Sequence, residues 1–423
     1  MLSKIGICVN IILPLPIYNT LKLIIFQDIL YRKVDILKIA GIVAEFNPLH
    51  NGHKYLIDCA KSNSDLVVCV ISSNFVQRGE PSIISKFERA KIAVSCDADI
   101  CIELPTPWAM STAQNFALGA ISQLIKFNID TLYFGSESGD LQALLDVANV
   151  LNSKEFNESI KNNLNDNITY AKLRQNTLYE FLGEQANILS GQNDTLAVEY
   201  ISAVKKFNKN IEFMPVKRQG AQHNDTTEID EYSTSTLIRQ AIRNNEIEKV
   251  KKFVPEAAYD ILENSNFANV EKLNLAIMAK LKTMKYEEFS NLPDISEGIE
   301  NRLYGAIKSS IDYNDLCEKV KTKRYTMARI RRLILSAFLG IDNSFFLNKI
   351  PYARVLATNE QGIKYISKIK TDNIVLQVSE LNKLDEFSNK IFDLECKISD
   401  VYNLALENAE YSGSDYTQGL IKK

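Results

Sequence analysis

Two of the chain's three histidines, His50 and His53, flank Gly52 in the order His-Asn-Gly-His. Residues at i and i+3 share one face of a helix, so both imidazoles are expected to point the same way. Gly52 has no side chain, and a ligand can therefore approach the backbone closely. A helix N-terminus offers unpaired N–H groups and a partial positive charge that suit a phosphate. Two imidazoles there can donate hydrogen bonds to a triphosphate and to a departing pyrophosphate.

The residues before these histidines are expected to hold them at the end of a strand. Residues 39–46 form an apolar run, and Pro48 cannot donate to a sheet and biases Asn47 away from helix. A helix is expected from about Asn51. The alternative is two ordinary polar residues at a helix cap, because four-residue patterns occur by chance. The strand before and the helix after favour nucleotide binding, and the pattern resembles the H-x-G-H signature of the nucleotidyltransferase superfamily.

The composition is that of a globular protein with two or three domains: 423 residues, 46% hydrophobic and 24% charged. A net charge of −3 argues against a uniformly basic nucleic-acid binder but leaves local basic patches open. The seven cysteines include no C-x-x-C pair. These features predict a reduced, cytoplasmic protein without structural zinc.

Residues 1–37 precede the first expected strand. Their apolar stretch is interrupted by Asn10, Pro14 and Pro16, and no signal-peptide cleavage site follows it. The stretch is also shorter than the roughly 18 apolar residues that a membrane span requires. We expect a poorly ordered N-terminal extension, with a membrane anchor as the less favoured alternative.

Residues 38–250 alternate between apolar strand-like runs and helical segments, which predicts an α/β domain with a Rossmann-like parallel sheet. Ligands of such sheets lie beyond the carboxyl ends of the strands. The loops at 47–53 and 74–80 and the loop at Gly135 are therefore expected to converge on one crevice. Its polar side chains are expected to include Gln77, Arg78 and Lys86, although surface cations are the alternative for the last two.

A second motif with phosphate chemistry is Ser233-Thr-Ser-Thr-Leu-Ile-Arg239. Its hydroxyls can cap a helix start, and Arg239 lies four residues after Ser235 on the same face. A capped helix without a ligand is the alternative. The presence of the His50–His53 motif in the same sequence favours a second phosphate-binding site. Asn193 or Asp194 is expected to cap another helix.

Residues 251–423 are expected to form a mainly α-helical domain with a small terminal α/β lobe that holds strands at 352–356 and 374–378. Residues 321–332 contain six cations, one tyrosine and no acid. Such a segment suits an RNA backbone and a splayed base, although a solvated helix face is the alternative. We expect RNA contacts here and in the first domain, at Arg78, Lys86, Lys321, Lys323, Arg324, Tyr325, Arg329, Arg331 and Arg332; the family resemblance described next implies that this RNA is a tRNA.

Several blocks together resemble the tRNA(Met) cytidine acetate ligase family. The resemblance runs from about Lys38 to the C-terminus and rests on Glu45–His53, Asn74–Pro81, Ile102–Pro105, Phe134–Glu137, Lys217–Arg218, Ser233–Arg239, Lys323–Thr326 and Arg329–Arg332. It implies that ATP and acetate form acetyl-adenylate and pyrophosphate, and that the acetyl group then passes to N4 of the wobble cytidine of elongator tRNA(Met). It implies no membrane and no protein partner.

The resemblance and the second motif imply catalytic roles for His50 and His53 and an ATP site without metal-ligating side chains, so that magnesium would arrive with ATP. The expected ATP-binding residues are Val43, Ala44, Glu45, Phe46, Asn47, Pro48, Leu49, His50, Asn51, Gly52, His53, Lys54, Tyr55, Leu56, Gly135, Asn193, Arg218, Ser233, Ser235 and Arg239.

Two other functions were weighed. A small-molecule adenylyltransferase of coenzyme synthesis needs little beyond the first domain and leaves the basic helical domain unexplained. A non-catalytic RNA-binding protein with a relict nucleotide site is disfavoured because His50, Gly52, His53, Ser233, Ser235 and Arg239 are all present.

Overall fold

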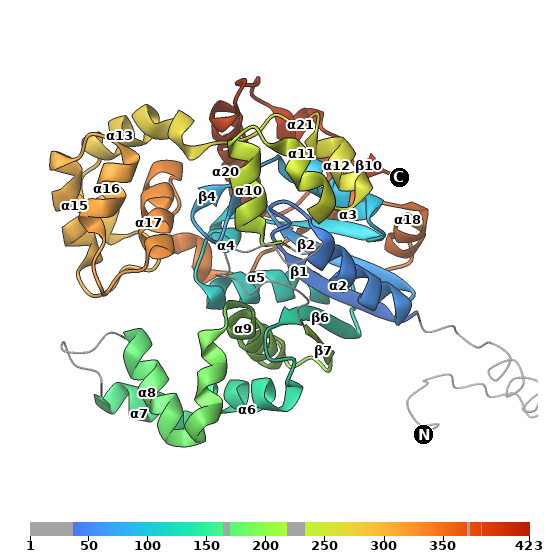
Figure 1. Cartoon of the computed structure of the whole chain (residues 1–423), viewed down its shortest axis with the longest axis horizontal. Helices are drawn as coiled ribbons and strands as arrows, with labels where there is room; N and C mark the ends of the chain where they lie inside the picture. The colour runs from blue at the N-terminus through green and yellow to red at the C-terminus, as the bar shows by residue number, and fades with distance from the viewer. Residues whose placement is uncertain (1–36, 164–169, 218–232, 370–372, 382) are drawn as a thin grey trace, which may run out of the picture. The chain divides into compact units, whose positions relative to one another are not determined.

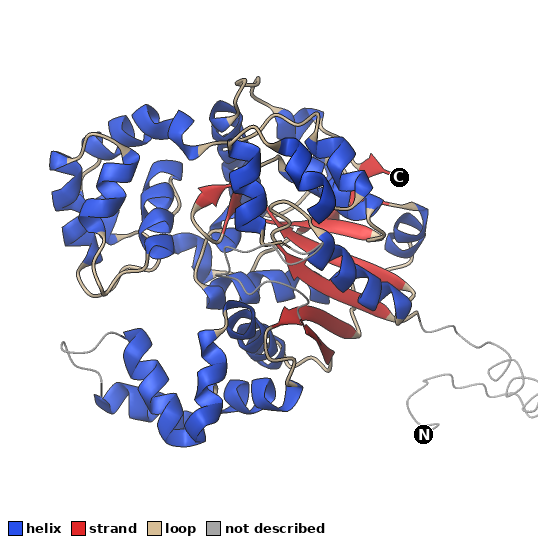
Figure 2. Cartoon of the chain, viewed as in Figure 1, coloured by secondary structure: helices blue, strands red, loops and turns tan. Residues whose placement is uncertain are grey.

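A mainly parallel sheet runs through the centre of the structure in the order β10-β8-β5-β2-β1-β6-β7, with β9 paired to β8 (Figure 2). The computed structural model describes residues 37–163, 170–217, 233–369, 373–381 and 383–423. The strands are β1 (Ile39–Ala44), β2 (Leu66–Ser72), β5 (Ile100–Leu104), β6 (Thr131–Ser136), β7 (Glu212–Lys217), β8 (Ala353–Thr358), β9 (Ile374–Val375) and β10 (Ile421–Lys422). The predicted α/β fold with a parallel sheet is confirmed.

Helices cover the sheet on both sides, which explains why its central strands are apolar throughout. Every residue of β2 is buried, and β2 lies parallel to both β1 and β5. One core joins sheet side chains to α2 (Asn51–Ser62), α3 (Lys86–Ser95), α10 (Ser235–Arg243) and α12 (Glu256–Leu262) (Figure 1). α5 (Ala113–Ile125) and α9 (Gln192–Lys206) pack on each other elsewhere against the sheet.

The predicted small terminal lobe is wrong. β8 pairs antiparallel with β5, and β10 pairs parallel with β8, so both strands extend the main sheet. Only Ile374–Val375 of the second predicted strand is extended, because Val378 already begins α19 (Val378–Leu381). β8 joins the main sheet because the backbone N–H and C=O groups along the open edge of β5 would otherwise be left unpaired. Residues 38–423 accordingly form one compact unit.

The region predicted to be mainly α-helical contains α13 (Asn274–Thr283), α14 (Tyr286–Ser290), α15 (Ile299–Ser309), α16 (Tyr313–Val320) and α17 (Met327–Leu339). α17 packs on the hairpin of β3 (Phe75–Val76) and β4 (Glu80–Pro81). Gly79 makes this approach feasible: its φ is +72°, and a Cβ there would lie 2.6 Å from the backbone nitrogen of Arg332. The helical region is thus seated directly against the second predicted crevice loop.

The predicted N-terminal extension lies outside the described residues, except for Leu37. In the part of the chain that the structure describes, no helix is both long enough and apolar enough to cross a membrane.

Five ionisable side chains, Lys86, Glu103, Arg354, Glu395 and Asp415, form a buried ion cluster between α3, β5, β8 and the C-terminal helices. Lys86 Nζ lies 2.5 Å from Glu103 Oε1 and 2.7 Å from Asp415 Oδ1. Arg354 pairs with Asp415 and lies 3.6 Å from Glu103 Oε2. Because each member is at most 5% exposed, the charges satisfy one another rather than water.

Glu395, on α20 (Glu386–Ala405), completes this cluster as a protonated acid. Ser73 Oγ lies 2.6 Å from Glu395 Oε2 and 2.9 Å from Glu103 Oε1. One hydroxyl has only one hydrogen, so it donates to Glu103 while Glu395 donates to Ser73. Burial, reinforced by the neighbouring Glu103 carboxylate, raises the pKa of Glu395 to about 8.

This protonation predicts a pH-dependent stability. An acid with a pKa of about 8 in the folded chain and 4.5 when unfolded binds more protons folded, so its stabilising contribution falls as pH rises between these values. The fall amounts to at most about 1.4 kcal/mol per pH unit. In Glu395→Gln the neutral amide can still donate to Ser73, and the free energy of unfolding should lose this part of its pH dependence. Denaturant titrations across that pH window measure it; equal slopes in both proteins would contradict the assignment.

Candidate active site

The first turn of α2 fixes both imidazoles in one tautomer. His50 is the N-cap residue, and its Nδ1 accepts the Gly52 N–H at 3.1 Å. His53 Nδ1 in turn accepts the His50 N–H at 3.3 Å. A neutral imidazole that accepts at Nδ1 carries its hydrogen on Nε2. The rings stack with centroids 3.8 Å apart, so the two Nε2–H donors lie side by side at the start of the helix.

The loop before α2 is held by Arg89 of α3, which is fully buried. Its guanidinium donates to the carbonyls of Glu45, Ser72 and Ser73 at 2.7, 2.8 and 2.6 Å. These carbonyls close the carboxyl ends of β1 and β2. One side chain therefore ties together the two loops that the sequence predicts to meet.

The second motif lies beside the first. Thr234 is the N-cap of α10, and its Oγ1 accepts the Leu237 N–H at 3.3 Å. Arg239, on the inner face of α10, donates to the Asn47 carbonyl at 2.8 Å and lies 3.1 Å from Glu80 Oε1. Burial lowers the pKa of Arg239, and the Glu80 carboxylate opposes that shift. The start of α10 is thus fastened to the loop that carries the histidines.

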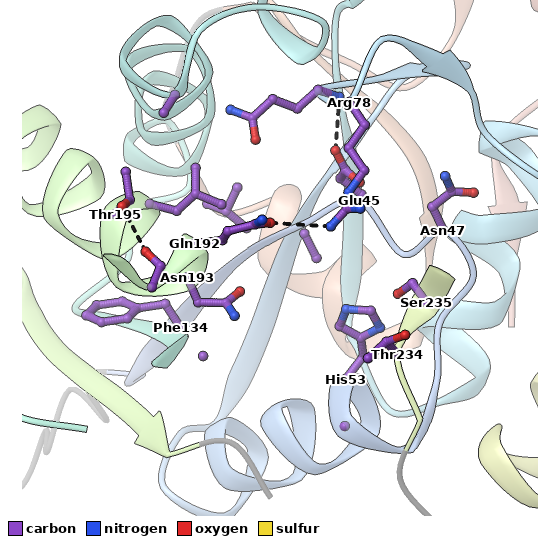
Figure 3. A pocket seen from close by; sticks show the side chains of 18 of the residues that line it. Glu45, Asn47, His53, Arg78, Phe134, Gln192, Asn193, Thr195, Thr234 and Ser235 are labelled. Atoms are coloured by element: carbon purple, nitrogen blue, oxygen red, sulfur yellow. Dashed lines mark hydrogen bonds between the residues drawn. The ribbon is translucent and has the colours of Figure 1, made fainter. Parts of the chain in front are cut away.

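Both motifs line one crevice of about 810 Å³ beyond the carboxyl ends of β1 and β6 (Figure 3). α9 and α17 supply further walls. Gln77 and Arg78 line it, as predicted for the hairpin loop. The predicted ATP-binding residues on its walls are Val43, Ala44, Glu45, Asn47, His50, Gly52, His53, Tyr55, Leu56, Gly135, Asn193, Ser233, Ser235 and Arg239.

Four buried polar atoms on these walls have no hydrogen-bond partner among the described residues: Asn47 Nδ2, Ser233 Oγ, Arg239 Nε and Arg332 Nε. All four can donate. A buried polar group without a partner is costly, at about 1–3 kcal/mol, so several donors on one wall indicate a ligand rich in acceptors. A nucleoside triphosphate has that chemistry, and the residues present therefore fit ATP.

Five predicted ATP-binding residues do not line the crevice, and their contact with ATP stays a prediction. Phe46 and Leu49 are fully buried in the core beneath the loop, and Pro48 lies between them in sequence. Asn51 donates to the Lys252 carbonyl. Lys54 pairs with Asp58 and Asp97 along α2. Arg218 lies outside the described residues.

The Gly135 loop and α9 exchange hydrogen bonds, which corrects the predicted cap. Gly191 is the N-cap, and the Glu137 carboxylate accepts the N–H groups of Asn193 and Asp194 at 3.1 and 2.8 Å. Asp194 instead accepts from Ser136, Glu137 and Ser138. The N–H groups of Asn193 and Asp194 in α9 are thus occupied by Glu137, which leaves the first turns of α2 and α10 as the candidate sites for phosphate.

An aromatic wall was missed by sequence reasoning. Phe116, Phe134 and Tyr200 come from α5, β6 and α9 and line the crevice, and the Phe134 and Tyr200 ring centroids are 6.3 Å apart. Apolar residues in periodic segments are usually core, so no local signal separates these three from their neighbours. Their apolar faces suit a purine ring.

Lys321, Lys323 and Arg324 are exposed, and Arg331 is half-buried, on the approach to α17. We call the three exposed residues the basic segment. Thr326, Ala328 and Arg332, just beyond it, line the crevice. An RNA phosphate can reach the basic segment, and its tRNA contact remains a prediction.

The structure does not offer Tyr325 or Lys86 to tRNA, and these predictions are wrong. Tyr325 is 6% exposed and donates its hydroxyl to the Glu297 carbonyl at 2.7 Å, so no base can stack on it as placed. Lys86 is fully buried in the ion cluster and does not line the crevice. Arg329 and Arg332 pair with Asp294, which ties them to the helical region.

Comparisons with known proteins agree with this architecture. The family model described as HIGH Nucleotidyl Transferase matches residues 37–416. The tRNA(Met) cytidine acetate ligase of Clostridium botulinum (strain Kyoto / Type A2) is 35% identical, over 90% of this chain and 97% of its own. That of Thermoanaerobacter sp. (strain X514) is 34% identical, over 91% and 99%.

Solved structures of Thermotoga maritima TmcAL have the same fold. The apo form covers 92% of this chain and all of its own, with a TM-score of 0.86 and 29% identity. The form bound to alpha-thio ATP has a TM-score of 0.84 and 28% identity over the same shares. Residues of the His-Asn-Gly-His motif line the crevice, and the similarity to these proteins extends over nearly all of residues 37–423. The chain therefore belongs to the tRNA(Met) cytidine acetate ligase family.

Proposed function

We propose that this protein is an ATP-dependent acetate ligase of the cytoplasm that forms N4-acetylcytidine at the wobble position of elongator tRNA(Met), by way of acetyl-adenylate. One observation carries the proposal: the stacked histidines and the start of α17 line the same crevice. The residues suited to a triphosphate therefore lie in the same crevice as the helix that follows the basic segment, to which RNA could bind.

In the first step an acetate oxygen attacks the α-phosphorus of ATP, and pyrophosphate leaves. Acetate is already an anion, so no base is needed. The two Nε2–H donors of His50 and His53 stabilise the charge that grows on pyrophosphate, and the α2 dipole adds to this. Ser233 and Arg239 supply further donors. ATP arrives as its magnesium complex; among the described residues, no cluster of His, Cys, Asp or Glu is arranged to hold a metal.

In the second step the acetyl group passes to the cytidine. The basic segment binds the RNA backbone, and an unstacked base can then enter the crevice past Thr326 and Ala328. Binding of this kind should weaken with salt, because phosphate contacts release counterions. The relatives named above carry this activity in their names, and their similarity over nearly the whole chain supports the proposal.

The test measures AMP and pyrophosphate release from ATP and N4-acetylcytidine in tRNA, with acetate and tRNA added singly and together. We expect acetylcytidine only when both are present, in elongator tRNA(Met) and not in a transcript whose wobble cytidine is replaced by uridine. Adenylate transfer to a small acceptor without tRNA would instead establish a small-molecule adenylyltransferase. RNA binding without ATP turnover would leave a relict nucleotide site.

A further inference from the structure

We propose that Glu45 is the general base of the acetyl-transfer step and takes the proton that the cytidine amine loses. This inference rests on the proposed function and assigns a role that the ATP-binding motifs leave open. The amino group of cytidine is a poor nucleophile, because its lone pair is delocalised into the ring. Removing its proton as the new bond forms is therefore worth a large factor in rate, roughly 10²–10⁴.

The other polar groups of the crevice cannot accept that proton. His50 and His53 use Nδ1 to accept backbone N–H groups and carry hydrogen on Nε2, so neither ring offers a lone pair. The remaining ionisable groups on the wall are the arginines, Lys217 and the phenols of Tyr55 and Tyr200, which are protonated near neutral pH. Among the described residues that line the crevice, Glu45 is the sole carboxylate.

Glu45 is held in place by one of its oxygens. Its Oε1 accepts the Gln77 N–H at 2.9 Å, and no described residue donates to Oε2. Burial raises the pKa of Glu45, and the charges of Arg78 and Arg239 oppose that shift. A carboxyl whose pKa is raised in this way is a stronger base than an ordinary one.

Glu45 also lies on the side of the crevice where RNA would enter. Arg332 of α17 donates to the Gln77 carbonyl at 3.3 Å. The backbone N–H of Gln77 in turn donates to the Glu45 carboxylate. A chain of contacts therefore runs from α17, which follows the basic segment, to the carboxylate. Figure 3 shows Glu45 in view between Arg78 and His53. An acetyl-adenylate with its phosphate near α2 would thus present its carbonyl carbon between the histidines and Glu45.

The step balances as follows. The cytidine N4 attacks the acetyl carbonyl carbon, and a C–N bond forms. The bond from that carbon to the AMP phosphate oxygen breaks, and its electron pair stays on AMP. One N4 proton passes to Glu45 Oε2. The products are N4-acetylcytidine, AMP and a neutral Glu45, which then returns its proton to solvent.

The experiment follows both steps in one reaction. Enzyme, ATP, acetate and tRNA are mixed, and pyrophosphate and N4-acetylcytidine are quantified against time; a parallel reaction supplies synthetic acetyl-adenylate in place of ATP and acetate. For Glu45→Gln we expect acetyl transfer slowed roughly 10²–10⁴-fold from either starting point, and a much smaller loss in first-turnover pyrophosphate release. The amide still accepts the Gln77 N–H, and thermal unfolding reports whether the fold is kept.

Two comparisons separate a base from a structural role. The wild-type transfer rate should rise with pH until Glu45 is ionised and then level off; Glu45→Asp should keep that limb at a lower rate, and Glu45→Gln should lose it. Glu80→Gln removes a nearby charge that pairs with Arg239, and should weaken the ATP step instead. Transfer by Glu45→Gln at the wild-type rate, or equal slowing of both steps, would overturn the inference. A wild-type protein that acetylates no tRNA would overturn the proposed function itself.

Discussion

His53→Asn is expected to lower acetate-dependent turnover of ATP by roughly 10²–10³-fold, the usual effect of removing one donor that serves a developing charge. The asparagine Oδ1 can still accept the His50 N–H, so the start of α2 should survive. What disappears is the Nε2–H donor that the proposed mechanism assigns to pyrophosphate. The loss should therefore fall on kcat, with a much smaller change in KM for tRNA. Steady-state pyrophosphate release at saturating acetate and tRNA measures it.

Lys54→Ala is the matched control, since Lys54 follows His53 directly but pairs with Asp58 and Asp97 away from the crevice. It should turn over ATP within about twofold of wild type. If His53→Asn kept wild-type turnover while Lys54→Ala lost it, the donor to pyrophosphate would have to be sought on the outer side of α2. Equal losses in both variants would point to the helix start as a whole rather than to one imidazole.

The sequence predicted the strands and helices well because their patterns are local. The apolar run at 39–46, the break at Pro48 and the spacing of His50 and His53 each act within a few residues. The pairing of β8 with β5 is different in kind. A run at 352–356 predicts a strand, but whether it joins a distant edge depends on which edge is left open.

The candidate site was predictable where a motif supplied consecutive residues and unpredictable where contacts come from afar. Glu137 caps α9 from a preceding loop, and Arg332 reaches Gln77 from the helical region. Such contacts have no local signal. Tyr325 is a case in which a local pattern was misleading. An aromatic residue among cations suggests base stacking, yet the Tyr325 ring packs in the core of the helical region.

Lys86 is the case in which a local signal did exist. Lys86, Arg89, Ala90 and Ala93 recur at i, i+3, i+4 and i+7, which places both cations on the buried stripe of α3. A cation on such a stripe must find acids in the core, and these acids are Glu103 of β5 and Asp415, near the end of the chain. We predicted a crevice and RNA contact for Lys86, with an exposed surface cation as the alternative, and did not use the helical periodicity, which is typical of an internal ion pair.

Lys86→Met therefore should destabilise the fold rather than weaken RNA binding. Removing Lys86 leaves Glu103 and Asp415 buried with Arg354 as their remaining cation, and breaking a buried pair in this way costs about 3–5 kcal/mol. Denaturant unfolding measures this loss. Lys91→Met is the control, because Lys91 is exposed on the same helix and its substitution should change stability by at most about 0.5 kcal/mol.

RNA affinity distinguishes the two roles of Lys86 directly. The folded fraction of Lys86→Met should bind tRNA with wild-type affinity and with the same slope of affinity against salt, because no phosphate contact has been removed. A variant as stable as wild type with a shallower salt slope would mean that α3 opens and presents its lysine to the RNA. Lys86 would then be paired within the ion cluster in the free protein and would contact tRNA when it is released. In that case Asp415→Asn, which removes one ion-pair partner of Lys86 but keeps the lysine, should strengthen tRNA binding.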